Sequence, residues 1–118
     1  MKLHYAFQTQ KKLFLVIDFC PGGDLETMIS EDQAPFTEDK ARFFIAEILV
    51  ALRDLHQRNI IYRDLKPDNV VIDDDGHMKL IDFGMAKMNI SMSQKGAKTF
   101  CGSIKYLAPE MLKKQGHG

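Results

Sequence analysis

The chain has 118 residues, enough for one small domain but not for two. Hydrophobic residues make up 45% of it and charged residues 27%, which is typical of an ordinary globular protein and excludes a disordered or fibrous class. Sixteen basic and sixteen acidic residues give a formal net charge of zero, so no overall field favours nucleic acid or a membrane surface. Any electrostatic function must therefore be local.

Cysteine and histidine usage predicts no metal site. Cys20 and Cys101 lie far apart, and neither they nor the four histidines show metal-type spacing. This favours a reduced, intracellular setting in which both cysteines pack as small apolar residues. The apolar run at 13–17 is too short for a signal peptide or a membrane span, and we predict a buried strand there. With no targeting signal, the cytoplasm is the default location.

The N-terminal third predicts a pair of strands followed by a short helix. Residues 3–7 and 13–19 are rich in apolar and aromatic side chains and are separated by a polar stretch, which indicates adjacent strands joined by a short turn. The sequence PGG at 21–23 cannot continue a central strand. We expect a short helix over about residues 25–30.

The strongest predicted element is a helix over about residues 37–58. Thr37 is suited to the N-cap, and Glu38 and Asp39 place negative charge in the first turn, where it favours the helix dipole. Apolar residues recur three or four positions apart and form one wide stripe: Ala41, Phe43, Phe44, Ile45, Ile48, Leu49, Leu52 and Leu55. The width of the stripe predicts burial over most of the circumference.

Residues 69–81 predict a β-hairpin. An irregular segment at 62–68 leads into an apolar strand, a turn containing Asp-Gly, and a second apolar strand. If Asp73 faces Met78, then Asn69 faces Asp82 at the open end of the hairpin. Beyond Gly84 the chain becomes polar and reads as a long loop ending near Tyr106.

This register predicts a site for phosphate and metal chemistry. Asn69 and Asp82 both offer the oxygen ligands that Mg²⁺ prefers, and Asp64 and Lys66 lie in the loop entering the first strand. A carboxylate base, an ammonium group and two oxygen ligands suit phosphoryl transfer, in which the protein mainly supplies charge and position. The run Asp73–Asp75 reads as a solvated turn instead.

Three ordered motifs resemble a known family. The stretch YRDLKPDN at 62–69, DFG at 82–84 and APE at 108–110 resemble the catalytic core of eukaryotic protein kinases, with Tyr62 in place of the usual histidine. The forms GGDL, YRDLKP and FCGSIKYLAPE are similar to the AGC group of serine/threonine kinases, and to its ribosomal-S6-kinase and Akt branches in particular.

The resemblance implies an α+β, protein-kinase-like fold of which the chain covers a part. Residues 1–23 would be the last strands of the N-lobe and the hinge. Residues 24–118 would be the first part of the C-lobe, with the long core helix, the catalytic loop and the activation segment. The implied cofactors are ATP and Mg²⁺, and the implied substrates are serine and threonine hydroxyls of proteins.

The resemblance implies a role for each matching residue. Asp64 would accept the proton of the substrate hydroxyl, Lys66 would steady the γ-phosphate, and Asn69 and Asp82 would hold Mg²⁺. Ile17 would be the gatekeeper, and the backbone of Asp18 and Cys20 in the hinge would meet the adenine. Asp24 would bind the ribose, and Val71 would pack under the base.

Regulation and substrate selection are also implied. Thr99 matches the activation-loop site that an upstream kinase phosphorylates, and Arg63 and Lys87 are the basic residues that would receive the phosphate. Ser103 would approach the catalytic carboxylate. Asp24 and Asp68 would select arginine upstream of the phosphorylated residue. The residues Leu3, Tyr62 and Phe83 would stack in an apolar spine.

Departures from the family pattern leave three alternatives. The chain shows no glycine-rich loop before Leu3, no lysine-bearing strand and no arginine partner for Glu110, and Ile104 and Lys105 replace the usual substrate-contacting residues. We therefore expect the chain alone to have little phosphotransferase activity and to expose apolar surface along its long helix. The alternatives are part of an active kinase, a non-catalytic kinase-like binding module, and a metal-binding protein built on Asp73–Asp75.

Overall fold

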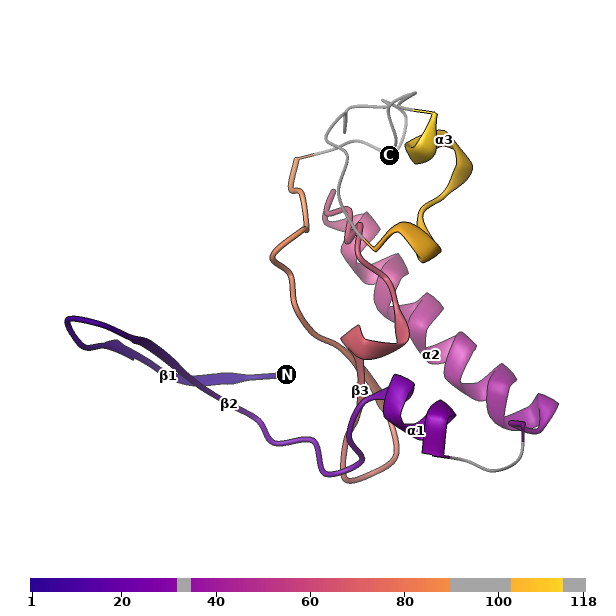
Figure 1. The fold of residues 1–118 in the computed structure, drawn as a ribbon, viewed down its shortest axis with the longest axis horizontal. Helices are drawn as coiled ribbons and strands as arrows, with labels where there is room; N and C mark the ends of the chain where they lie inside the picture. The colour runs from indigo at the N-terminus through magenta and orange to yellow at the C-terminus, as the bar shows by residue number, and fades with distance from the viewer. Residues whose placement is uncertain (32–34, 90–102, 114–118) are drawn as a thin grey trace.

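Two antiparallel hairpins and two principal helices make up the computed structural model, which describes residues 1–31, 35–89 and 103–113 (Figure 1). In chain order the elements are β1 (Leu3–Gln8), β2 (Leu13–Ile17), α1 (Leu25–Glu31), α2 (Glu38–Gln57), the 3-10 turn η1 (Pro67–Asn69), β3 (Val70–Ile72), β4 (Met78–Leu80), the 3-10 turn η2 (Ile104–Tyr106) and α3 (Pro109–Leu112). The predicted α+β class is confirmed.

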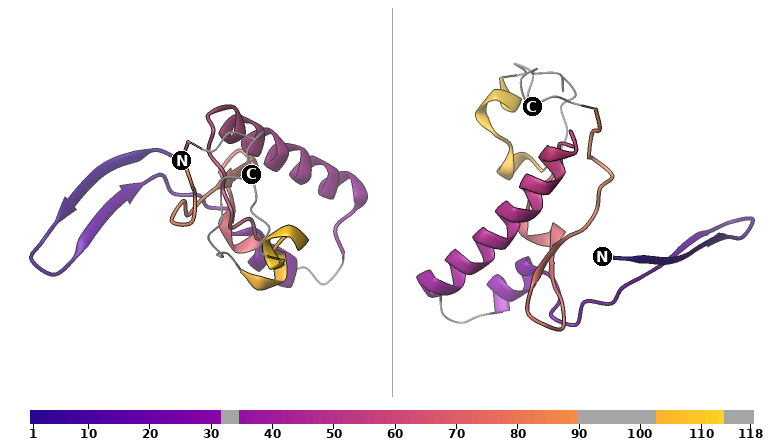
Figure 2. Two further views of the ribbon diagram at one scale, coloured as in Figure 1. Left: turned by 90° about the horizontal axis from the view of Figure 1, so that it is seen from above. Right: turned by 180° about the vertical axis from the view of Figure 1, so that it is seen from behind.

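The β1–β2 hairpin projects away from the remaining elements (Figures 1 and 2). Its strands pair from Leu3 opposite Ile17 to Gln8 opposite Leu13, and the rings of Phe7 and Phe14 stack with centroids 5.1 Å apart. The two strands are predicted correctly. The prediction of a buried second strand is wrong, because all five β2 residues are exposed on a hairpin that leaves the body of the protein.

Helix α1 begins at a side-chain cap that the sequence reading did not identify. The Asp24 carboxylate accepts hydrogen bonds from the Thr27 backbone N–H (2.7 Å) and the Thr27 hydroxyl (2.9 Å). These bonds satisfy a donor that the first turn of a helix leaves without a partner. Leu25 is consequently directed into the core, where it is buried.

Helix α2 has the predicted bounds and the predicted N-cap. The Thr37 hydroxyl accepts a hydrogen bond from the Lys40 N–H (3.3 Å). At the other end Asn59 adopts a left-handed conformation with φ 57°, and the Ile60 N–H reaches back to the Leu55 carbonyl (3.0 Å), the Schellman pattern. Within the described part of the chain, no helix has both the length and the apolar character needed to cross a membrane.

Burial of α2 is much narrower than predicted. Phe44 is the buried residue of the helix, whereas four other apolar side chains are exposed: Phe43, Ile45, Leu49 and Val50. Only one face of the helix meets the β3–β4 hairpin, and no described element covers the opposite face (Figure 2). The predicted exposure of apolar surface along the helix is confirmed, and the predicted burial over most of its circumference is wrong.

A small core joins α1, α2 and the β3–β4 hairpin. Its buried apolar residues come from all three elements and are Leu25, Phe44, Val70, Ile72 and Met78. The partly buried residues packed against them are Met28, Phe36, Ile48 and Leu80. The Phe36 and Phe44 rings meet edge to face at 5.6 Å, a favoured aromatic geometry. The core therefore supports the hairpin from one side.

The register of the β3–β4 hairpin differs by one residue from the prediction. Ile72 faces Met78 and Val70 faces Leu80, so Asn69 lies opposite Ile81 and not opposite Asp82. The difference arises in the turn, which contains one residue more than predicted.

Asp73 organises this turn with its side chain. Its Oδ1 accepts hydrogen bonds from the N–H groups of Asp75 (3.1 Å) and His77 (2.8 Å), and its Oδ2 lies 2.9 Å from Lys79 Nζ. The Asp73 N–H in turn donates to the His77 carbonyl (3.0 Å). Asp73 is thus buried and structural, and the solvated-turn prediction holds only for the exposed Asp74 and Asp75.

The outer edge of β3 is covered by the segment before α1. The Gly22 N–H donates to the Ile72 carbonyl (3.1 Å), and the Ile72 N–H donates to the Gly23 carbonyl (2.9 Å). A Cβ atom at Gly22 would lie 2.6 Å from Ile72 Cβ, so only glycine allows this approach. The contact attaches the segment following β2 to the hairpin that carries Asn69.

Candidate active site

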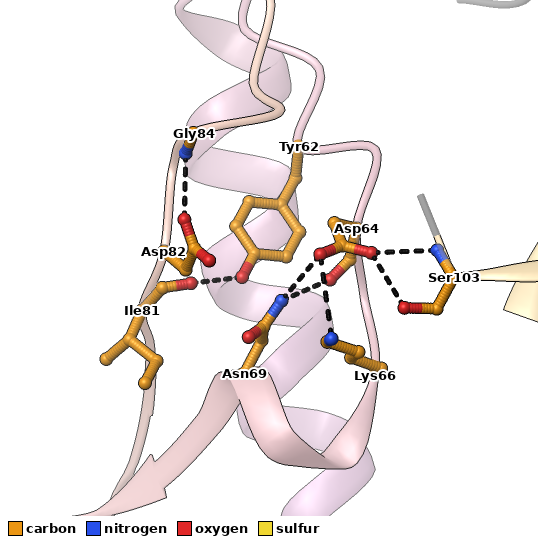
Figure 3. A network of polar contacts seen from close by, with 8 residues as sticks. All are labelled: Tyr62, Asp64, Lys66, Asn69, Ile81, Asp82, Gly84 and Ser103. Carbon is orange, nitrogen blue, oxygen red and sulfur yellow. Dashed lines mark hydrogen bonds and ion pairs between the residues drawn. The ribbon is translucent and has the colours of Figure 1, made fainter. Parts of the chain in front are cut away.

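The loop before η1 is held by Tyr62. The Tyr62 side chain is 1% exposed, and its hydroxyl donates a hydrogen bond to the backbone carbonyl of Ile81 (Figure 3). Its ring meets the Phe83 ring edge to face at 5.3 Å. Phe83 is nevertheless half exposed, and Leu3, the third residue of the expected spine, is exposed on β1. Only the Tyr62–Phe83 part of that spine is in contact here.

Asp64 is the centre of a cluster of polar side chains. Its carboxylate is 11% exposed, and its Oδ2 accepts a hydrogen bond from Asn69 Nδ2 (3.0 Å), which also donates to the Asp64 backbone carbonyl (2.9 Å). Lys66 Nζ lies 3.9 Å from the same Oδ2. Ser103 donates to Oδ1 from its N–H (3.0 Å) and its hydroxyl (3.3 Å). Figure 3 shows these side chains converging on the carboxylate.

Asp82 reaches the site from the segment that follows β4. It adopts a left-handed conformation with φ 56°, uncommon for a residue other than glycine, and its Oδ1 accepts a hydrogen bond from the Gly84 N–H (3.0 Å). Figure 3 shows Asp82 and Asn69 near the Tyr62 hydroxyl. Asp82 reaches this place because it follows directly after the residue that Tyr62 binds.

The pKa of Tyr62 depends on the groups that surround its hydroxyl. Burial and then the negative charges of Asp64 and Asp82 together raise its pKa to about 12, and a hydrogen bond with Asn69 acts in the opposite direction. Each of these effects requires proximity to the hydroxyl. Asp64, Asn69 and Asp82 therefore surround one buried phenol, although Asn69 and Asp82 are not directly opposite in the hairpin.

The donor set fits a magnesium ion bound together with phosphate. Both hydrogen bonds of Asn69 Nδ2 go to Asp64, so the Asn69 Oδ1 atom can serve as a ligand of the ion. Asp82 adds a carboxylate. In the described ranges, no three acidic, histidine or cysteine side chains lie close enough to hold a metal by themselves. One carboxylate and one amide, completed by water and phosphate oxygens, is a normal arrangement for Mg²⁺.

The expected nucleotide-binding residues lie along the segment from β2 to α1. Ile17 ends β2 and is exposed, and Cys20 is a half-buried free thiol. The Asp18 carboxylate accepts hydrogen bonds from the Lys2 N–H (2.6 Å) and from His4 (2.7 Å), which lower its pKa in that order of importance. Its side chain is therefore committed to β1, and its backbone is the part left for a ligand.

Asp24 and Val71 are neighbours across an isolated backbone bridge. The pKa of Asp24 is lowered, chiefly by the Thr27 N–H that it caps. Val71 is half buried on β3. A carboxylate has about four acceptor positions, so the cap leaves capacity for one more hydroxyl donor. Asp68, the other expected acidic residue, is exposed on η1.

Arg63 is held in an unusual conformation beside the segment that follows Asp82. Its φ is 68°, its Nε donates to the Met85 carbonyl (2.7 Å), and one of its terminal nitrogens is buried without a partner among the described residues. The backbones of Ile61 and Lys87 pair through two hydrogen bonds (2.8 and 2.9 Å), which brings Lys87 to the same side of the loop. Thr99 lies outside the described residues.

Two contacts near the site were not predicted from the sequence, although one of them has a sequence signal. Glu47 of α2 bonds to the β3–β4 turn at His77, thirty residues later, and no local pattern links such positions. The Asp24–Thr27 cap does have a signal, because a capping residue followed three positions later by a polar residue is typical of a helix start. The metal-cluster alternative finds no support at Asp73, whose oxygens are occupied by turn N–H groups and Lys79.

The fold is α+β and protein-kinase-like, and the chain as a whole matches a known family. Residues 1–118 match the protein kinase domain model, so the chain belongs to the protein kinase family, as its motifs predict. The match covers the described and the undescribed parts of the chain alike.

Particular relatives narrow the comparison. The chain is 50% identical over 117 residues to ribosomal protein S6 kinase alpha-3 of Homo sapiens, covering 99% of this chain and 16% of that protein. It is also 50% identical to the putative ribosomal protein S6 kinase alpha-1 of Caenorhabditis elegans and 49% identical to ribosomal protein S6 kinase alpha-6 of Homo sapiens, covering 99% of this chain and 15% of each. The chain thus spans about one sixth of the curated relatives it matches.

Proposed function

We propose that these residues form part of the active site of an ATP-dependent protein serine/threonine kinase of the AGC group. The reaction would transfer the γ-phosphate of ATP to serine or threonine hydroxyls of protein substrates. The observation that carries the proposal is the Asp64 carboxylate, which is nearly buried, accepts a hydroxyl donor at 3.3 Å and lies 3.9 Å from an ammonium group.

The roles follow from the chemistry of each group. Asp64 accepts the proton of the incoming hydroxyl, in the way that it now accepts the hydrogen bond from the Ser103 hydroxyl. Lys66 lies beside it and offers positive charge to the γ-phosphate. Asn69 and Asp82 hold Mg²⁺, which when bound would offset the charge of the phosphate oxygens.

The nucleotide would lie along the segment that joins β2 to α1. It would meet Ile17 at the exposed end of β2 and then the backbone of Asp18 and Cys20. Asp24 and its bridge partner Val71 would complete the set. In this proposal residues 1–23 belong to the N-lobe and hinge, and the following residues belong to the C-lobe.

Regulation and substrate choice are further parts of the proposal. A buried Arg63 nitrogen without a described partner is suited to a phosphate, and Lys87 lies on the same side. Phosphorylation of Thr99 by an upstream kinase would supply that phosphate and order the loop. Asp24 and the exposed Asp68 would favour arginine in the substrate. A cytoplasmic location remains a prediction.

The decisive experiment is a kinase assay on the full-length product that contains these residues. Asp64→Asn should lower kcat by about 10²–10⁴-fold, because it removes a general base. Asp82→Asn should raise the Mg²⁺ concentration needed for half-maximal activity. The control is Asp74→Asn, an exposed carboxylate in the β3–β4 turn, which should leave both values unchanged.

The assay also separates the alternatives. Equal kcat for the wild type and Asp64→Asn would overturn the catalytic role of Asp64. Nucleotide binding with no phosphoryl transfer by the full-length wild type would favour a kinase-like binding module. The 118 residues assayed alone should show little or no transfer, because they contain no glycine-rich loop and no lysine-bearing strand of the kinase pattern.

A further inference from the structure

Besides the apolar core, one carboxylate of the long helix α2 bonds directly to the β3–β4 hairpin. Glu47 Oε1 lies 2.5 Å from His77 Nδ1, and Glu47 Oε2 accepts a hydrogen bond from the Met78 N–H (2.7 Å). The Glu47 side chain is only 22% exposed. One oxygen therefore bonds to the turn, and the other bonds to the first residue of β4.

The Met78 N–H needs an acceptor from outside the hairpin. Backbone hydrogen bonds join Asp73 to His77 and Asn69 to Ile81, so the N–H of Met78 points away from β3. Among the described residues this sheet has two strands, and no third described strand pairs with β4. Met78 is buried in the core, and a buried N–H without a partner is strongly destabilising. Glu47 supplies that partner.

Charged groups surround His77 on both sides. From α2 it faces Glu47, and the Phe43 ring lies 6.2 Å from its own ring. From the hairpin it faces the carboxylates of Asp73 and Asp75, while Lys79 is paired with Asp73 at 2.9 Å. The hydrogen bond to Glu47 is the largest of the effects that raise the pKa of His77, followed by the charge of Glu47. Protonation of the ring is thus favoured by the same carboxylate that binds Met78.

We propose that Glu47 is a positioning residue for the β3–β4 hairpin, and that protonated His77 strengthens its hold. The link between α2 and β4 then weakens as His77 loses its proton. The hairpin begins directly after Asn69 and leads two residues later into Asp82, so its attachment sets the position of both. This last consequence rests on the proposed function, whereas the link itself does not.

The first test is the titration of the His77 ring in the full-length product, followed by NMR and assigned by comparison with His77→Gln. The pKa should lie above the ordinary value of 6.5 and should fall in Glu47→Gln. The matched control is Asp54→Asn, which removes a carboxylate from α2 that pairs instead with Arg58 at 3.1 Å. An unchanged His77 pKa in Glu47→Gln, or a wild-type value at or below the ordinary one, would overturn the proposal.

The second test is hydrogen exchange of the Met78 amide. Glu47→Gln keeps an acceptor oxygen and should retain most of the protection, whereas Glu47→Ala should lose about tenfold or more, as expected for a charge-assisted hydrogen bond. In the wild type the protection should fall as the pH rises through the His77 pKa, and in His77→Gln it should not. Equal protection in Glu47→Ala and the wild type would also overturn the proposal.

A kinase assay then tests the consequence for activity. The pH profile of kcat should lose its His77-dependent limb in Glu47→Gln and keep it in Asp54→Asn. Superimposable profiles for the wild type and Glu47→Gln would show that the link does not position the catalytic groups. Titration and exchange need neither ATP nor turnover, so a failure of the proposed function leaves these two outcomes readable.

Discussion

The hydroxyl of Tyr62 donates a hydrogen bond to the backbone carbonyl of Ile81, the residue directly before Asp82. In the β3–β4 ladder the Ile81 N–H donates to the Asn69 carbonyl (3.0 Å), but the Asn69 N–H turns away to the Lys66 carbonyl (3.0 Å). Tyr62 therefore completes the last rung of the hairpin with a side chain. The loop that contains Asp64 and the segment that carries Asp82 are joined at this point.

Removal of that hydroxyl should loosen the hairpin. Tyr62→Phe leaves the Ile81 carbonyl without its donor, and the expected loss is about 1–3 kcal/mol in the free energy of unfolding. Urea unfolding would measure it. The matched control is Tyr5→Phe, because Tyr5 is 70% exposed on β1 and its change should stay within about 0.5 kcal/mol. Equal midpoints for the two variants would contradict the prediction.

The same tyrosine should ionise late. Its folded pKa is raised from 10 to about 12, so the contribution of the neutral hydroxyl to stability is complete below pH 10 and is lost as the pH rises towards 12. Ultraviolet titration of tyrosinate should show a transition near that pH that Tyr62→Phe lacks. Identical titration curves for the wild type and Tyr62→Phe would rule out the buried environment described here.

Asp73 should make the fold sensitive to acid. Lys79 and then the His77 N–H lower its pKa from 3.8 to about 2. Its stabilising contribution is therefore present above pH 3.8 and is lost as the pH falls towards 2. Asp73→Asn should flatten the acid limb of stability against pH, measured by urea unfolding at several pH values. Asp74→Asn, an exposed neighbour, should retain the wild-type slope.

Gly22 should tolerate no side chain. A Cβ atom there would lie 2.6 Å from Ile72 Cβ and 2.9 Å from the Ile72 carbonyl oxygen, so Gly22→Ala must displace the segment from β3. The expected loss is about 1–3 kcal/mol or more in thermal or urea unfolding. Gly23→Ala is the comparison, since Gly23 has open space but a φ of 68° and should lose only about 1 kcal/mol. The reverse order would show that Gly22 does not contact β3.

The uncovered apolar face of α2 should drive association. Ile45 and Leu49 are 57% and 59% exposed one helical turn apart, beside the exposed Phe43 and Val50. Sedimentation velocity on the 118 residues alone should show larger species as the concentration rises. Ile45→Lys combined with Leu49→Glu should reduce this association, whereas Arg53→Glu, a charge change at an exposed position of the same helix, should not.

Local chemistry explains what sequence analysis predicted well. The Thr37 cap, the apolar stripe and the end near Arg58 determine α2, and its observed bounds agree. The Asp-Gly turn likewise predicts the second hairpin. Each of these signals involves residues that are only a few positions apart. Asp64, Lys66 and Asn69 likewise lie within six residues, and their meeting at one carboxylate follows from a tight loop.

Burial and register could not be predicted in this way. The run at 13–17 has the composition of a core strand but is exposed, because burial depends on which elements pack against it. The hairpin register shifted by one residue because the Asp73 side chain draws two further N–H groups into the turn. A side-chain bond of this kind leaves no periodic signal in the sequence.

The helices and strands, the family and the residue types of the candidate site could all be predicted from the amino-acid sequence, since they depend on neighbouring positions and on short motifs. The bonds of Tyr62 to Ile81 and of Glu47 to His77 span 19 and 30 residues respectively and became visible only in the folded chain. Such contacts arise when separate elements pack, because a hydrogen bond depends on distance and direction in space and not on separation along the chain.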